Sequence, residues 1–205
     1  VTKSLIGGHF QPFALDLGCP GRASRGMMTD TPQTIHLHEY QPPAFLVERV
    51  ELEFDLQPHD TTVLARATFR RNPDHGADNG ADNADLRLDG EDMELVSLSL
   101  DGTVLAAADY DLDAAGLSLT DLPDAFELSV VTRIAPAANT KLEGLYQSSG
   151  IFCTQCEAQG FRRITYFPDR PDVMTTYRVT MRAEKAVCPI LLCNGNLLDA
   201  GDLPD

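Results

Sequence analysis

The chain has 205 residues, 43% of them hydrophobic and 23% charged, so it can bury the core of one large domain. Its 31 acidic and 16 basic residues give a formal net charge of −15, which argues against nucleic acid and anionic membrane surfaces, because both require a basic footprint. No apolar stretch approaches the roughly 18 residues of a membrane-spanning helix.

The start of the chain does not have the pattern of a secretion signal, because Gln11, Pro12 and Asp16 interrupt its apolar run. We expect residues 1–34 to be a disordered extension of a single domain that spans residues 35–205. The number of cysteines is odd, which favours reduced thiols and a cytoplasmic protein. These cysteines are Cys19, Cys153, Cys156, Cys188 and Cys193.

The dominant hydrophobic period is two. Apolar and acidic residues alternate strictly over 50–56, and the alternation returns over 63–69, which predicts an antiparallel pair of strands. Turn signals separate further short apolar runs, as is typical of a sandwich. We therefore expect an all-β fold, a single-domain antiparallel β-sandwich with little helix. The further strands are expected at 86–88, 95–100, 103–105, 116–119, 126–134, 151–154, 162–167, 174–182 and 189–193.

The last expected strand runs into Asn194-Gly195-Asn196, a hairpin turn signal. The returning strand would begin near Leu197, only a few residues before the chain stops at Asp205. We therefore expect the domain to be truncated at its C-terminal end.

Two segments have residue patterns that partly resemble metal sites. The acidic, glycine-rich loop 72–85 has calcium-like spacing but lacks the closing glutamate of an EF-hand loop. Cys153 and Cys156 form a C-x-x-C pair, but a structural zinc usually requires a second such pair, and Cys188 and Cys193 are spaced differently. Small buried thiols explain the first pair more simply.

A polar cluster at 155–163 follows one expected strand and precedes another, so the sheet could present it to a ligand. Glu157 in this cluster could bind a cation. Arg162 or Arg163 could equally neutralise it, and the residue types alone favour such a surface ion pair.

Several blocks of the chain, in matching order from about residue 40 to 196, resemble the N-terminal domain of the bacterial-type aminopeptidase N family. These are zinc-dependent alanyl aminopeptidases of the gluzincin class of metallopeptidases. The blocks are LEGLYQS (142–148), CTQCEA (153–158), GFR (160–162), RITY (163–166) and DRPDV (169–173), supported by LRLDGED (86–92), IAPAANT (134–140) and LLCNGN (191–196).

The resemblance implies a saddle-shaped, mostly antiparallel β domain, followed in the family by a thermolysin-like catalytic domain. That second domain holds the zinc, the H-E-x-x-H helix and the Gly-Ala-Met-Glu-Asn loop, and this chain contains neither motif. Zinc is therefore expected as a cofactor of the full-length enzyme, with no metal ligand and no catalytic residue in this chain. The missing catalytic domain is the expected partner.

By resemblance, Glu157 would bind the α-amino group of a peptide substrate, and Gln155 would line the pocket for its first side chain. An α-amine with a pKa near 7.7–8.0 is largely protonated at neutral pH, so a carboxylate suits it. The alternative is a stand-alone β-sandwich that serves as a non-catalytic binding or interaction module.

Overall fold

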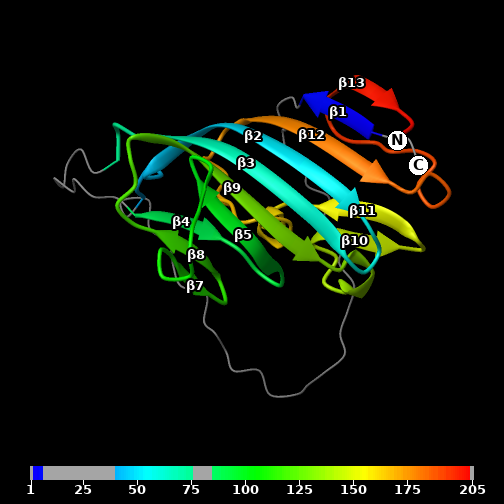
Figure 1. Cartoon of the computed structure of the whole chain (residues 1–205), viewed down its shortest axis with the longest axis horizontal. Helices are drawn as coiled ribbons and strands as arrows, with labels where there is room; N and C mark the ends of the chain where they lie inside the picture. Colours follow the sequence, from blue (N-terminus) through cyan, green and yellow to red (C-terminus); the bar gives the residue numbers. More distant parts are fainter. Residues whose placement is uncertain (1, 7–39, 76–84, 204–205) are drawn as a thin grey trace, which may run out of the picture. The chain divides into compact units, whose positions relative to one another are not determined.

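The computed structural model describes residues 2–6, 40–75 and 85–203, without the side chains of 2–6. Its strands form an eight-stranded, a three-stranded and a two-stranded sheet (Figure 1). The order in the large sheet is β13-β1-β12-β2-β3-β9-β5-β6. These strands are β1 (Thr2–Ile6), β2 (Phe45–Leu56), β3 (Thr61–Arg71), β5 (Glu94–Leu100), β6 (Thr103–Val104), β9 (Ala125–Ile134), β12 (Thr176–Ala183) and β13 (Asn196–Gly201).

The two small sheets lie on the core side of the large one (Figure 1). One has the order β4-β8-β7, and the other is the hairpin of β10 and β11. Short 3₁₀ helices, η2 and η3, are the only helical elements among the described residues. The bounds are β4 (Leu86–Asp89), β7 (Asp111–Asp113), β8 (Gly116–Leu119), β10 (Gly144–Ser148), β11 (Ile151–Gln155), η2 (Pro136–Ala138) and η3 (Phe161–Arg163).

Alternation in β2, β3 and β9 builds the core. Val50, Leu52, Phe54 and Leu56 of β2 are buried, while the residues between them lie on the outer face. The register of β2 against β3 shifts between Val47 and Arg49, so Phe45 and Val47 keep the same buried face despite the extra residue. The period of two therefore decides which face of the large sheet is dry.

Three phenylalanines join β2, β3 and β9 in this core. The rings of Phe69 and Phe126 stack with centroids 5.1 Å apart, and Phe45 meets Phe126 edge-on at 5.3 Å. Both arrangements are favoured by the quadrupoles of aromatic rings. The cluster therefore fixes the three central strands against each other.

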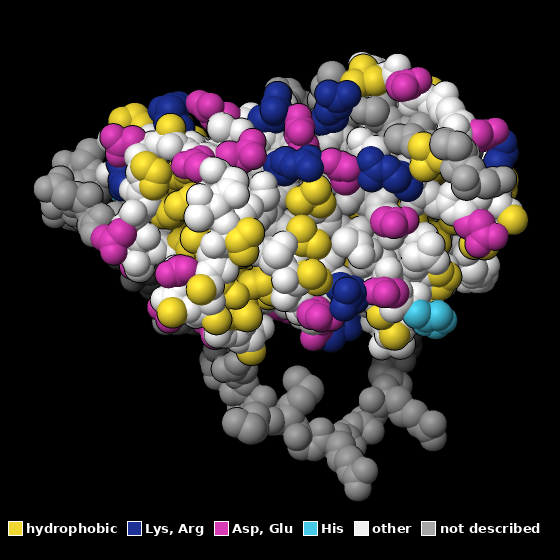
Figure 2. Space-filling view, in the orientation of Figure 1, with side chains coloured by type: hydrophobic (Ala, Val, Ile, Leu, Met, Phe, Trp, Pro, Cys, Tyr) yellow, Lys and Arg dark blue, Asp and Glu magenta, His cyan; other side chains and the backbone are white. Residues whose placement is uncertain are grey.

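The outer face of the large sheet is charged instead. Figure 2 shows side chains of both signs interspersed along its upper part. Glu53 of β2 accepts hydrogen bonds from Arg66 of β3 at 2.7 Å and from Arg182 of β12 at 2.9 Å. These two arginines lower the pKa of the Glu53 carboxyl. Opposite charges on neighbouring strands thus compensate each other on this face.

The all-β fold with little helix is confirmed, with differences in detail. The pair of β12 and β2 is parallel, whereas an antiparallel sandwich was expected. The strand expected at 162–167 is wrong, because this segment is η3 followed by a buried turn. The strand expected at 189–193 is also wrong, because this segment is irregular and leads directly into β13.

The expected extension 1–34 falls mostly outside the described residues, as does loop 76–84, the larger part of the weighed calcium site. Thr2–Ile6 departs from that expectation, since it forms β1 between β12 and β13. The boundary between residues 34 and 35 remains a prediction.

Candidate functional site

The candidate site is the turn of residues 156–160, between β11 and η3. Leu145 of β10 anchors the β10–β11 hairpin in the hydrophobic core. The hairpin therefore carries the turn on a fixed base. Glu157 and Gln155 are both exposed there, and the peptide bond between Glu157 and Ala158 is cis.

Two glycines allow the turn to pack closely against the hairpin. A Cβ added to Gly160 would lie 2.2 Å from the carbonyl oxygen of Gln155, closer than any real side chain. Gly144, paired with Gln155, has a φ of +71°, and a Cβ there would lie 2.7 Å from the Cβ of Arg163. The amide of Gly160 closes the turn by donating to the carbonyl of Cys156 at 2.8 Å.

The Glu157 carboxylate forms no ion pair within the part of the chain that the structure describes. The backbone of Glu157 does make a hydrogen bond, because the side-chain Nε2 of Gln155 donates to the Glu157 carbonyl at 3.0 Å. The structure thus brings the two sequence-predicted residues together and leaves the carboxylate exposed.

Arg163, one of the two arginines considered as a partner of Glu157, is bound elsewhere. Its guanidinium contacts Glu91 Oε2 at 2.5 Å and Glu143 Oε2 at 3.1 Å, and it also pairs with Asp92. Only 10% of its side chain is exposed. Sequence reasoning missed this cluster, since Glu91 and Asp92 are some seventy residues away and no local pattern links them to Arg163.

Arg162 is also occupied. Its Nε lies 3.1 Å from Asp169 Oδ2, and its Nη1 lies 3.7 Å from Asp89 and 3.8 Å from Glu91. In addition, the amide of Glu91 donates to the Arg162 carbonyl at 3.0 Å. Both arginines therefore hold η3 to the connection between β4 and β5, and neither neutralises Glu157.

Aromatic residues pack together directly after the turn. The Phe161 ring meets Phe167 at 5.0 Å and Tyr177 at 5.9 Å, both edge-on. Burial, aided by the Asp169 charge, raises the pKa of the Cys156 thiol to about 11 and also raises the pKa of Tyr177. A thiol that stays protonated at neutral pH is a poor nucleophile and a poor metal ligand.

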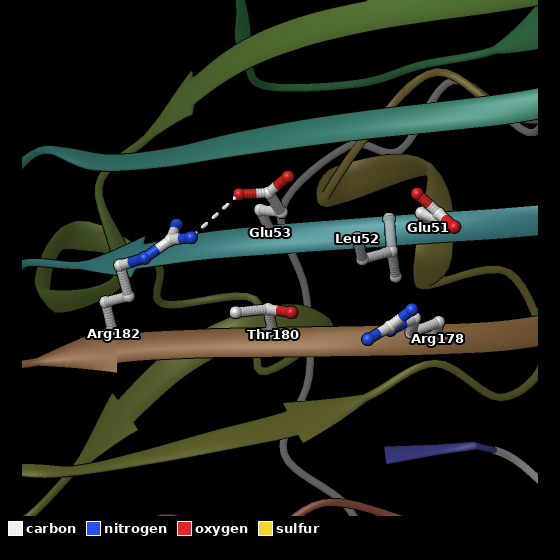
Figure 3. A pocket seen from close by; sticks show the side chains of 6 residues that line it. All are labelled: Glu51, Leu52, Glu53, Arg178, Thr180 and Arg182. Atoms are coloured by element: carbon white, nitrogen blue, oxygen red, sulfur yellow. Dashed lines mark hydrogen bonds and ion pairs between the residues drawn. The ribbon is translucent and has the colours of Figure 1, made fainter. Parts of the chain in front are cut away.

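One hollow among the described residues lies beside Arg163, where Asp92, Asn139 and Lys141 also line it. A hollow on the outer face of the large sheet is lined by residues of β2 and β12, where Arg182 pairs with Glu53 (Figure 3). No three His, Cys, Asp or Glu side chains in the described ranges are placed to hold a metal ion. The described part of the chain also contains no helix long and apolar enough to cross a membrane.

Comparison with known proteins identifies the family. Residues 74–205 match the model of the peptidase M1 N-terminal domain, which is more than half of the chain. The chain belongs to the peptidase M1 family. It is 48% identical to aminopeptidase N of Caulobacter vibrioides and 42% identical to aminopeptidase N of Escherichia coli, in each case over 86% of this chain. The resemblance to the N-terminal domain of bacterial aminopeptidase N is thereby confirmed.

Solved peptidase structures are similar to this chain. Aminopeptidase A of Legionella pneumophila, solved in complex with aspartic acid, superposes with a TM-score of 0.73 at 34% identity, covering 82% of this chain and 19% of that one. An M1 zinc metallopeptidase of Deinococcus radiodurans has a TM-score of 0.55 at 15% identity, covering 70% and 33%, which shows the shared fold alone. The chain spans about a fifth of the length of the aminopeptidase N relatives.

Proposed function

We propose that this M1 N-terminal domain serves a zinc aminopeptidase that removes N-terminal residues from peptides, and that it supplies the anchor for the substrate's α-amino group. Glu157 is the anchor and Gln155 lines the pocket for the first side chain. The observation that carries the proposal is the exposed Glu157 carboxylate, which pairs with no cation among the described residues although two arginines follow within six residues.

The charge arrangement suits an ammonium ligand. Charge-assisted hydrogen bonds between an α-ammonium group and a carboxylate are worth roughly 1.5–3 kcal/mol each. A blocked or internal peptide bond has no such cation, so it would leave the carboxylate unpaired. A carboxylate on a turn held by Gly160 and Gly144 therefore favours the free end of a peptide over its interior.

We propose that peptide hydrolysis is carried out by residues of a catalytic domain and not by the residues described above. The described residues do not fit a zinc ion, so no step through the metal is derived from this chain. We propose zinc as the metal of the whole enzyme, as the resemblance to the zinc-dependent alanyl aminopeptidases implies. The partners we propose are the peptide N-terminus and a catalytic domain of the same polypeptide. The free cysteines at 153, 156, 188 and 193 support our proposal of a cytoplasmic location.

The test uses a chimera in which this chain replaces the matching fifth of the Caulobacter vibrioides aminopeptidase N. We expect Glu157→Gln, which keeps size but removes charge, to lower kcat/KM for an alanyl p-nitroanilide about 10- to 100-fold, the loss of one charge-assisted hydrogen bond. Bound zinc, measured by atomic absorption, should not change.

The matched control is Glu127→Gln, the same substitution at an exposed position on β9. It should leave kcat/KM within about twofold of the parent chimera, as is usual for surface changes. Parent-like kinetics for Glu157→Gln would refute the anchor.

A further inference from the structure

The cluster around Arg163 joins three segments that are distant in sequence. Glu91 and Asp92 come from the connection between β4 and β5, Glu143 immediately precedes β10, and Arg163 ends η3. Lys141 adds a second cation, 2.7 Å from Asp92. The guanidinium therefore serves as a shared centre for carboxylates that would otherwise repel each other.

This centre is connected to the Glu157 turn through short contacts. The amide of Arg163 donates to the Gly160 carbonyl at 3.1 Å, and Gly160 donates to Cys156 at 2.8 Å. Where Gly144 pairs with Gln155, its Cα faces the Cβ of Arg163. Gln155 in turn donates to the Glu157 carbonyl. A displacement of Arg163 would thus move both ends of the turn that carries Glu157.

We infer that Arg163, clamped by Glu91, Asp92 and Glu143, is a positioning residue that fixes where the Glu157 carboxylate stands. The inference rests on the proposed anchoring role of Glu157 and adds a residue that does not itself touch the substrate. A residue buried to this degree and paired with three carboxylates has a defined geometry, which an exposed single ion pair would not provide.

The first experiment measures hydrogen exchange in this chain. Arg163→Gln removes the cation and leaves a shorter, uncharged side chain, so the amide of Gly160 should exchange about tenfold faster or more, as expected for the loss of a charge-assisted contact. Amides of β3 and β9 should keep their rates. Glu143→Gln removes one of the three negative charges around Arg163, at a half-exposed position, and should give a smaller change in the same direction.

The matched control is Arg87→Gln, which breaks the exposed pair of Arg87 and Asp113 on the three-stranded sheet. It should leave the exchange of Gly160 unchanged. Arg163→Lys keeps the charge but cannot reach three carboxylates at once, so it should restore only part of the protection. Unchanged exchange of Gly160 in both Arg163→Gln and Glu143→Gln would overturn the inference.

The second experiment is a double-mutant cycle in the chimera. Arg163→Gln should lower kcat/KM about tenfold through KM, and should add less than about twofold in the Glu157→Gln background, because it acts through that carboxylate. Full additivity would overturn the positioning role. A neutral Glu157→Gln together with faster Gly160 exchange in Arg163→Gln would instead refute the anchor, while retaining Arg163 as the residue that holds the turn.

Discussion

Gly160 closes the Glu157 turn where no side chain fits. An added Cβ would lie 2.2 Å from the Gln155 carbonyl oxygen and 3.0 Å from the Gly144 nitrogen, both backbone atoms that cannot move alone. We expect Gly160→Ala to lower the free energy of unfolding by about 1–3 kcal/mol, the usual cost of overpacking, measured by urea denaturation. Gly201→Ala is the control, because a Cβ there meets no described atom within 4 Å. Equal urea midpoints for the two variants would contradict this packing.

The partly buried Cys156 thiol makes the free energy of unfolding fall as the pH rises above 9. Burial raises the pKa of its thiol from an ordinary 9.0 to about 11, so the unfolded chain binds fewer protons than the native one between these values. The contribution is therefore complete below pH 9 and is lost as the pH rises through about 11, on the order of 2 kcal/mol. Urea midpoints measured from pH 8 to 11 should fall less steeply in Cys156→Ala. If the urea midpoints of the parent chain and of Cys156→Ala fell in parallel with pH, the Cys156 thiol would not be the cause of the pH dependence.

Sequence reasoning pointed to the Glu157 turn as a candidate site, but it did not predict the contacts that hold this turn in place. Glu157 stood out because a carboxylate in a polar run after a strand is a local pattern. The choice between ligand anchor and internal ion pair could not be made locally, since Arg162 and Arg163 pair with Asp169, Glu91 and Glu143. Most of these partners come from elements remote in sequence, and only folding brings them together.

At the scale of elements, the phenylalanine cluster makes β9 the central support of the large sheet. Phe126 contacts both Phe45 and Phe69, and only 4% of it is exposed. Phe126→Ala should cost about 3–5 kcal/mol, because the large cavity forms between three strands that cannot collapse easily. Thermal and urea unfolding measure the loss. Leu192→Ala, at a residue that is 83% exposed, is the control and should change stability little. A loss near that of the control would mean that the strands can close the cavity.

Strands with a wet and a dry face were predictable, whereas buried segments were not. Residues 50–56 and 63–69 alternate cleanly and lie within β2 and β3. Residues 164–168 are all buried in succession, so their β-branched and aromatic side chains imitated a strand although the backbone turns. The residues at 189–193 are apolar without alternation, and most of them remain exposed or half-exposed. Intrinsic β-propensity alone did not produce a strand at 189–193, because these residues do not form a continuous apolar face that packs against the core.

At the scale of the molecule, local patterns predicted the fold class but not the order of strands. β12 pairs in parallel with β2 although more than a hundred residues separate them. Such pairing depends on which apolar faces meet in the core, for example Val179 beside Leu52, and not on a turn between neighbours.

The segment 187–203 presents six large apolar side chains that are about half exposed or more, and exposed apolar surface is a feature of interaction sites. The chain spans about a fifth of its aminopeptidase N relatives, so we expect the remaining polypeptide of the chimera to cover this segment. The residues are Val187, Ile190, Leu192, Leu197, Leu198 and Leu203, each about half exposed or more.

Carbene footprinting with mass spectrometry measures this coverage. Labelling of 187–203 should fall several-fold from the isolated chain to the chimera, because a docked domain excludes the reagent together with water. Val104 on β6, at the far edge of the large sheet, is 73% exposed and serves as the internal control, with labelling expected to stay constant. Equal labelling of 187–203 in both proteins would show that these side chains stay in water, and the rest of the polypeptide would then have to dock elsewhere.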